Sequence, residues 1–278
     1  MRARLLAATG AAGLALASLA LAAPAAQAAS GTATLYVLHG VPGLTVDVWV
    51  NGERTLDDFT PGSLAGPLDL APGTYSVAIT AADAADASSP AIGPVDLPLE
   101  AGASYTAVAH LDASAKPTAT LFTNDMSTLA AGQGRLTVRH VAAAPAVDVL
   151  AGGSPVISGL TNPNEKVLDL PAGTVSASVV AAGTTSPALL GPADVNVKEG
   201  ANTILYAWGD ATATPSTLAL ATQVIDGMHG DPSGVAAGET GAAADQGVPG
   251  WAWATTVGAA AGMLALVATR RRLAVARR

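Results

Sequence analysis

The sequence predicts an all-β fold with two small antiparallel β-sandwich domains in tandem, followed by one C-terminal transmembrane helix. Short segments of alternating apolar and polar residues are separated by turns that contain Gly or Pro, and no window in residues 33–222 sustains a helical period without Gly or Pro. The same order of segments occurs twice along the chain, which predicts two equivalent domains. An uninterrupted apolar run near the C-terminus predicts the helix.

The N-terminal segment, residues 1–28, has the order of a secretory signal peptide. Arg2 and Arg4 precede an apolar run that ends at the small-residue sequence Ala26-Gln27-Ala28. A charged head, an apolar middle and an A-x-A end predict export and cleavage after Ala28. An uncleaved N-terminal membrane anchor is the alternative.

Residues 33–123 are predicted to form the first sandwich. Val46, Val48 and Val50 alternate with other residues, which is typical of a strand with two distinct faces, and Asn51-Gly52 follows as a hairpin turn. The second domain, residues 134–222, is the repeat of the first. Several short strands in so few residues favour a sandwich of the immunoglobulin or transthyretin type.

Two pairs of segments carry the repeat. TLYVLHGVPGLTVDVWVNG at 34–52 matches RLTVRHVAAAPAVDVLAGG at 135–153, and residues 68–74 match 168–174. These segments resemble the bacterial domain-of-unknown-function family 4397, whose pattern is approximately V-R-V-V-H-A-S-P-D-A-P-x-V-D-V-Y-V-D-G, followed by L-P-A-G-x-Y-x-V. Both copies lack the S-P-D-A-P part. The resemblance implies secreted or surface β domains, often in tandem, and implies no reaction.

Four further segments complete the predicted organisation. Residues 124–133 form a short linker that permits the two domains to pack on each other. Residues 223–250 are rich in Gly, Ala, Asp and Ser, which predicts a flexible stalk. Residues 251–269 carry no charge and are long enough to cross a bilayer, and the five arginines of residues 270–278 are expected to stay cytoplasmic. A buried core helix is the alternative for the apolar run.

The composition excludes several kinds of site and partner. Without cysteine, the chain cannot form thiol nucleophiles, disulfides, Cys-ligated zinc sites or iron–sulfur clusters. Seven of the 13 basic residues lie in the two terminal segments, so six face all 21 acidic residues in the exported part, a charge of −15. Because phosphate binding needs clustered basic side chains, we expect no nucleic-acid partner. The high alanine content, with more Arg than Lys, indicates an actinobacterial source.

The candidate site residues occupy equivalent positions in the two repeats. His39 and His140 share a strand face with neighbouring apolar residues, and they are candidate metal ligands or general bases. The alternative is a histidine that packs at the core edge while its ring N–H binds a loop carbonyl. Asp47 and Asp148 are candidate cation ligands, and the alternative for them is a solvated or turn-locking aspartate. We predict no catalytic residue, resident metal or cofactor.

Two functional hypotheses follow from the sequence. Because neither G-x-S-x-G nor H-E-x-x-H occurs, we expect a non-enzymatic protein of the cell surface, held by a single-pass membrane anchor with its ectodomain outside. Its role would be adhesion, envelope structure or binding of a cell-envelope protein or polysaccharide. The alternative is an envelope hydrolase or metal-dependent enzyme with a site between the two domains.

Overall fold

The computed structural model describes residues 31–229, and all regular elements in this range are strands. The first eight are β1 (Ala33–His39), β2 (Val46–Val50), β3 (Glu53–Phe59), β4 (Leu64–Leu70), β5 (Gly73–Ala81), β6 (Ile92–Leu99), β7 (Ser104–Leu111) and β8 (Pro117–Thr123). They form two four-stranded sheets, in the orders β4-β1-β7-β8 and β3-β2-β5-β6. β1 and β7 pair in parallel, and the other pairs are antiparallel.

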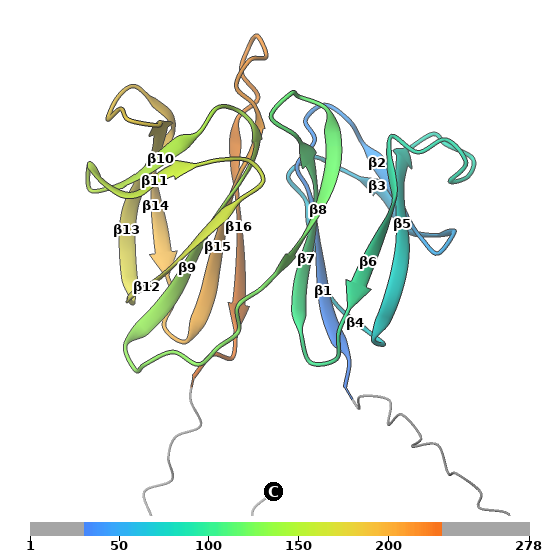
Figure 1. Ribbon diagram of the computed structural model, residues 1–278, viewed down its shortest axis with the longest axis horizontal. Helices are drawn as coiled ribbons and strands as arrows, with labels where there is room; N and C mark the ends of the chain where they lie inside the picture. The colour runs from blue at the N-terminus through green and yellow to red at the C-terminus, as the bar shows by residue number, and fades with distance from the viewer. Residues whose placement is uncertain (1–30, 230–278) are drawn as a thin grey trace, which may run out of the picture. The chain divides into compact units, whose positions relative to one another are not determined.

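The second eight strands repeat this arrangement. They are β9 (Gln133–Ala143), β10 (Val147–Ala151), β11 (Ser154–Leu160), β12 (Glu165–Pro171), β13 (Gly173–Ala181), β14 (Ala188–Val197), β15 (Ala201–Asp210) and β16 (Ala219–Asp226). Their sheets have the equivalent orders β12-β9-β15-β16 and β11-β10-β13-β14, and β9 pairs with β15 in parallel. The all-β fold and its sandwich architecture are thereby confirmed (Figure 1).

The strand order distinguishes between the two sandwich types expected. An immunoglobulin constant domain places its first, second, fifth and fourth strands in one sheet. Here the first strand of each sandwich lies in the other sheet from the second and pairs with the fourth and the seventh. The immunoglobulin arrangement therefore does not describe either sandwich.

Inward-facing aliphatic side chains hold the two sheets of each sandwich together. In the first sandwich the core combines Leu35 from β1 with Val48 from β2 and Ile79 from β5. In the second sandwich Leu136, Val149 and other equivalents do the same. With no cysteine in the chain, the sandwiches are stabilised by this burial without covalent cross-links.

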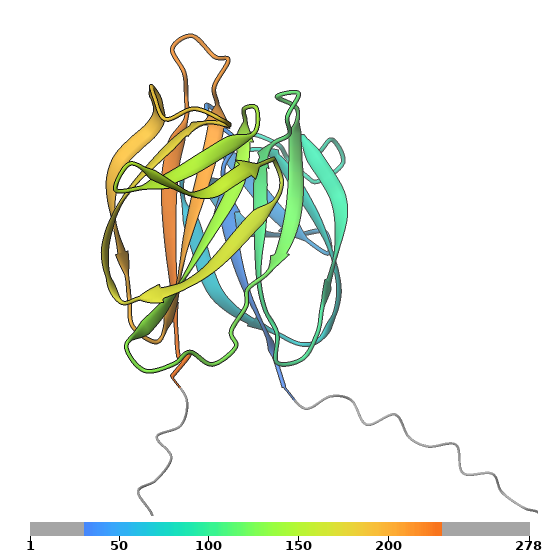
Figure 2. The same cartoon turned by 60° about the vertical axis from the view of Figure 1, so that its left-hand side comes forward.

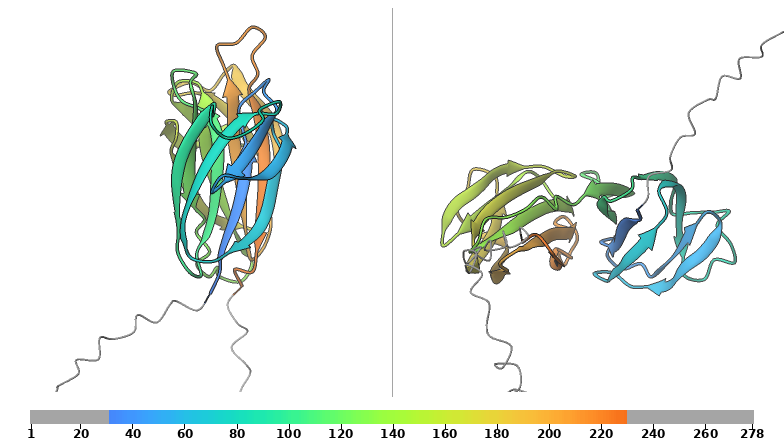
Figure 3. Two further views of the ribbon diagram at one scale, coloured as in Figure 1. Left: turned by 90° about the vertical axis from the view of Figure 1, so that its right-hand side faces the viewer. Right: turned by 90° about the horizontal axis from the view of Figure 1, so that it is seen from below.

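The two sandwiches also pack on each other through the sheets that contain β1 and β9 (Figure 3, right). Leu38, Val108 and Phe122 of the first sandwich form one buried cluster with residues of the second, among them Ile204 and Tyr206. As a result β9 and β15 are buried on both faces over most of their length. The sequence prediction that the linker permits packing between the domains agrees with this contact.

The ends of the described chain lie on one side of the double sandwich. β1 begins and β16 ends at the same end, where Thr32 and Asp226 line one shared depression (Figures 1 and 2). We call this the near end, and the opposite one the far end. Apart from the linker 124–132, the turns at the near end are short, and the longer loops of the far end are residues 40–45, 82–91, 182–187 and 211–218.

Several predicted segments fall wholly or partly outside residues 31–229. The signal peptide, most of the stalk, the apolar segment 251–269 and the tail 270–278 lie there. Within the described range, no helix has the length and apolarity needed to span a membrane. The predicted stalk began too early, since β16 continues to Asp226 and buries Gln223 and Ile225. Small and polar residues surround Gln223 and Ile225 in the sequence, so the apolar pattern of a strand is weak there.

Candidate functional site

His39 and His140 hold the loops that follow their strands. The Nε2 atom of His39 lies 2.6 Å from the carbonyl oxygen of Leu44, and that of His140 lies 3.0 Å from the carbonyl oxygen of Pro145. Both rings are almost fully buried, and the His39 ring stacks on Phe59 at a centroid distance of 6.0 Å. Each histidine thus joins its strand to a residue near the end of the following loop at the far end.

Burial sets the charge of the two imidazoles. It lowers the pKa of each histidine, and the hydrogen bond to the loop carbonyl offsets only part of this effect. The rings are therefore neutral at neutral pH, with the proton on Nε2 assigned from the carbonyl acceptor. In the described residues, Nδ1 of His39 is buried without a hydrogen-bond partner, and Nδ1 of His140 accepts from the amide of Ala142 at 3.4 Å. A substrate or metal has no open path to either atom.

Asp47 and Asp148 bind backbone amides on neighbouring strands. Oδ1 of Asp47 accepts from the amide of Asp58 at 3.0 Å, and Oδ1 of Asp148 accepts from the amide of Gly159 at 2.7 Å. Asp58 and Gly159 have φ angles of 50° and 64°, and the register of each hairpin shifts close by. Each carboxylate therefore fixes an equivalent irregularity in β3 or β11.

The surroundings of Asp47 include the only carboxylate group in residues 31–229 that satisfies the spacing for a metal ion. Asp47, Asp57 and Asp58 each offer an oxygen within 4.8 Å of the others. Arg54 already occupies this group, because its Nη1 lies 3.1 Å from Asp47 and 2.9 Å from Asp57. Burial alone would raise the pKa of Asp47, but the hydrogen bonds from Asp58 and Arg54 lower it below its usual value. The arrangement is an ion-pair cluster in which a guanidinium supplies the positive charge.

The structure does not bring the four candidates together. Within the described chain, no hydrogen bond or ion pair joins any two of His39, His140, Asp47 and Asp148. The second oxygen of Asp148 accepts from the amide of Gly183 at 2.8 Å. The histidines and the aspartates both form hydrogen bonds with backbone groups around them.

A buried polar network between the sandwiches was not predicted from the sequence. Arg139 is fully buried, and its guanidinium donates to Glu165 at 2.7 Å, to the hydroxyl of Tyr206 at 2.8 Å and to Oδ1 of Asn124 at 3.0 Å. Its Cζ atom lies 4.4 Å from the ring centroid of Phe122, on the first sandwich. Arg139 therefore contacts both sandwiches by charge-assisted hydrogen bonds and by a cation–π contact.

The same network continues onto β7 and β16. The Tyr206 hydroxyl donates to Oε1 of Gln223 at 2.6 Å, and the Thr106 hydroxyl lies 3.1 Å from Oδ1 of Asn124 and 3.2 Å from Oε1 of Gln223. Burial raises the pKa of Tyr206, against the opposing effect of the Arg139 charge. The phenol stays protonated and can donate, so the interface is joined by polar as well as apolar contacts.

His110 and Asn162 complete the interface toward the far end. Oγ1 of Thr120 and the carbonyl oxygen of Leu111 each lie 2.9 Å from a ring nitrogen of the buried His110. Burial lowers the pKa of His110, and the hydrogen bond to Leu111 and the charge of Asp112 offset only part of this effect. Asn162 of the second sandwich donates to the carbonyl oxygen of Leu111 in the first at 2.8 Å.

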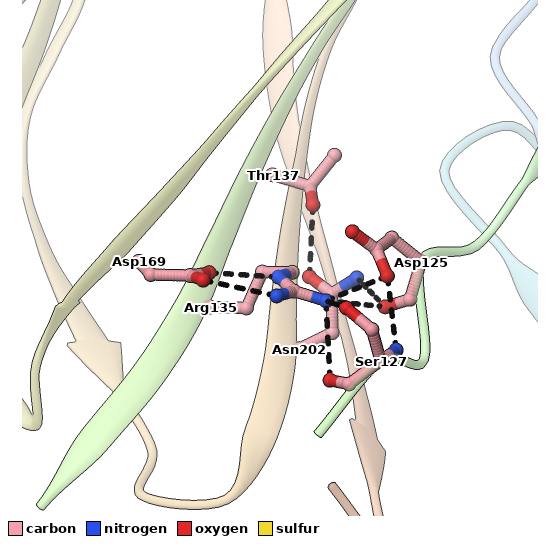
Figure 4. A network of polar contacts seen from close by, with 6 residues as sticks. All are labelled: Asp125, Ser127, Arg135, Thr137, Asp169 and Asn202. Carbon is pink, nitrogen blue, oxygen red and sulfur yellow. Dashed lines mark hydrogen bonds and ion pairs between the residues drawn. The ribbon is translucent and has the colours of Figure 1, made fainter. Parts of the chain in front are cut away.

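A second arginine fastens the linker to the second sandwich (Figure 4). Arg135 binds both carboxylate oxygens of Asp169, at 2.8 and 3.0 Å, in the bidentate geometry that guanidinium favours. Its Nη1 reaches the carboxylate of Asp125 at 2.7 Å and the hydroxyl of Ser127 at 2.9 Å. Asn202 donates to the carbonyl oxygen of Asp125 at 3.3 Å. The chain between the sandwiches is thus held by side chains on either side of it.

The comparison with protein families identifies part of the chain. No curated protein matches the sequence. Residues 33–150 match the model of DUF4397, a domain of unknown function. The matched segment contains the whole first sandwich and continues through β9 to Leu150 in β10, where the second copy of the His and Val-Asp-Val motif lies. This match supports the DUF4397 family for residues 33–150.

Proposed function

We propose that this chain is a non-enzymatic surface protein of the bacterial cell, which presents the double sandwich outside the membrane to a ligand of the cell envelope. In this proposal residues 1–28 direct export and residues 251–269 anchor the chain. The second sandwich is a further copy of the DUF4397 domain, and both sandwiches are of the transthyretin type.

The observation that carries the proposal is the difference between the two ends of the double sandwich. The start of β1 and the end of β16, the first and last described strands, both lie at the near end (Figure 2). Apart from the linker 124–132, the longer loops lie at the far end (Figure 1). A chain anchored at its C-terminus would present those loops away from the membrane, and binding residues are disproportionately found on loops held by a rigid scaffold.

Three aspartates at the far end, Asp86, Asp112 and Asp210, bind groups of the loops in which or before which they lie. Asp86, Asp112 and Asp210 each accept hydrogen bonds from residues two to four positions further along their loop. These bonds hold the pKa of each carboxyl below its usual value, so the loops stay charged. Such loops favour a ligand with cationic or hydrogen-bonding groups, as envelope proteins and polysaccharides have.

A non-enzymatic role is supported by the way the candidate residues are used. His39 and His140 bind loop carbonyls, while Asp47 and Asp148 bind amides at strand irregularities. These contacts explain why the residues recur in both repeats without requiring a reaction. The interface network around Arg139 likewise joins buried groups to one another.

The absence of cysteine makes the predicted topology directly testable. Ala85→Cys lies exposed in a far-end loop, and Ala276→Cys lies in the arginine-rich tail. We expect a membrane-impermeant maleimide to label Ala85→Cys in intact cells and Ala276→Cys only after permeabilisation. Labelling of Ala276→Cys in intact cells, or of Ala85→Cys only after permeabilisation, would overturn the topology.

The ligand-binding part of the proposal needs a separate experiment. A photo-crosslinker attached at Ala85→Cys should capture an envelope component, whereas the same group at Ala172→Cys, exposed at the near end, should not. Equal capture from both positions, or capture only from Ala172→Cys, would contradict ligand binding at the far end.

A further inference from the structure

The first sandwich contains an apolar cavity between its two sheets. Its volume is about 290 Å³, and aliphatic side chains from both sheets form nearly all of its wall. Well-packed interiors contain few voids larger than a water molecule, so a cavity of this size is a departure from ordinary core packing. An apolar cavity that lacks polar partners for water is suited to an apolar guest.

The cavity is elongated along the strands. Tyr75, Val77 and Ile79 of β5 all line it, and the four steps along the strand from Tyr75 to Ile79 cover roughly 14 Å. Leu35 and Val37 of β1 line the opposite wall. The hydroxyl of Tyr75 donates to the carbonyl oxygen of Ala71 at 2.9 Å, so its ring alone faces the cavity as an apolar group. The shape fits an extended chain.

Small residues on β7 and β8 account for the space. Ala107 and Ala119 line the cavity. The strand registers place Leu205 and Leu220 at the equivalent positions of the second sandwich. The cavity beside Leu136 and Val149, which match Leu35 and Val48, is smaller, about 190 Å³, and Leu205 and Leu220 line a separate hollow of about 360 Å³ beside β14. The two copies therefore differ in where their cores leave space.

The cavity opens between the edge strands β3 and β4. Three polar residues, Asn51, Glu53 and Thr55, line it on the β3 side and are exposed to solvent. β6 and β8 close the other side of the sandwich by packing against each other, and in the second sandwich β11 packs against β12. β3 and β4 make no such extensive contact. A ligand thus has an entrance beside an acidic side chain.

From these features we propose that the first sandwich binds an uncharged ligand through an extended aliphatic chain. The lining supplies apolar contacts along the chain, and Glu53 at the entrance disfavours a ligand with a carboxylate head, since like charges repel. A lipid acyl chain and a free aliphatic alcohol share this chemistry. The inference goes beyond the proposed function, because it concerns a cavity inside the first sandwich and not the far-end loops.

The test uses the full chain in lipid nanodiscs and an aliphatic alcohol that carries a photoreactive diazirine. After illumination, mass spectrometry should find the label on peptides from β1, β5 and β7, and decanol should compete for it. The matching carboxylic acid should label several-fold less. A photoreactive phospholipid in the same nanodiscs distinguishes the two sources. If the phospholipid also labels these peptides, the cavity accepts a membrane acyl chain, and if the alcohol alone labels them, it accepts a free aliphatic alcohol.

Two variants decide the result. Ala107→Leu with Ala119→Leu copies the second sandwich, and it should reduce labelling of these peptides at least tenfold, while Ala85→Leu in an exposed loop should leave it unchanged. Glu53→Gln, on the surface, should bring the acid's labelling close to that of the alcohol. Unchanged labelling in the double variant, or label spread evenly over both sandwiches with every probe, would overturn the inference. Neither result depends on the cysteine topology experiment, so the two proposals fail separately.

Discussion

Replacing Arg139 by methionine tests whether the buried network joins the two sandwiches into one cooperative unit. Methionine has a similar length and keeps the apolar contacts of the side chain, but it removes the charge and every hydrogen bond of the guanidinium. We expect the variant to unfold more easily and its two sandwiches to unfold less cooperatively.

The expected loss of stability depends on which hydrogen bonds the partners of Arg139 keep in the variant. Asn124 still accepts from Thr106, and Tyr206 still donates to Gln223, so neither is left without a partner. The side chain of Glu165 is 31% exposed and can be rehydrated. The variant loses three charge-assisted hydrogen bonds and the contact with Phe122. It also no longer buries a charge, and this gain offsets part of the loss. We estimate a net loss of about 2–3 kcal/mol in the free energy of unfolding.

Trp208 provides a probe for the assay. A Cβ atom built on Gly40 or Gly62 of the first sandwich would lie 3.3 or 3.1 Å from Trp208 side-chain atoms, so the indole of the second sandwich packs directly on the first. In a chain carrying Trp49→Phe, Trp251→Phe and Trp253→Phe, Trp208 is the remaining tryptophan, and its fluorescence can be followed during urea unfolding beside the far-ultraviolet circular dichroism. In Arg139→Met the fluorescence transition should move to lower urea and separate from the dichroism transition.

Arg54→Met is the matched control. Arg54 also pairs with carboxylates, but its side chain is 46% exposed and lies in the first sandwich. Asp57 is exposed, and the buried Asp47 keeps its hydrogen bond from the amide of Asp58, so we expect a loss of at most about 1 kcal/mol and two coincident transitions. If Arg139→Met is as stable as the wild type, or loses no more than Arg54→Met, the network does not couple the sandwiches and the reasoning is refuted.

Two further predictions concern the histidines and Asp148. The pKa values of His39, His110 and His140 are lower in the folded chain than the usual value of about 6.5. Below that pH the unfolded chain therefore binds more protons than the folded chain. The free energy of unfolding should fall as the pH drops below about 6.5, by up to about 1.4 kcal/mol per histidine at pH 5.5. Urea unfolding at pH 7.5 and 5.5 measures this, and a His140→Gln chain that keeps the full pH dependence would contradict it. Asp148→Ala should lose about 1–3 kcal/mol in the same assay at pH 7.5, because two amides lose their acceptor, whereas no change would show that these bonds contribute nothing.

The alternating pattern predicted much of the fold because it records burial inside each sandwich. The three alternating valines lie in β2, which forms the predicted hairpin with β3 across Asn51-Gly52, and the repeated order of segments corresponds to a repeated order of strands. The histidine and aspartate positions were also found from the sequence, since they recur in both copies. Their individual partners depend on loop carbonyls and strand irregularities that periodicity does not encode.

The contact between sandwiches could not be read from local patterns. Arg135, Thr137 and Arg139 alternate with apolar residues in β9, which is the pattern of a strand with one solvated face. All three are buried, because the linker and the first sandwich cover that face. The nearest signal is the run of apolar residues on both faces of β15, which is typical of a strand buried on two sides. Likewise, the cavity arises from alanines whose effect appears only when the two copies are compared in register.

The face shared by the sandwiches has a consequence for the history of the chain. A solitary first sandwich would expose Leu38, Val108 and Phe122 to water, and a solitary second sandwich would expose Ile204 beside a buried arginine that had lost Asn124. Exposed apolar patches of this kind promote aggregation. Losing one copy by deletion would therefore harm the other. A chain of this design would therefore have to keep both sandwiches or lose both, while the core inside each sandwich, which the other does not touch, can change independently.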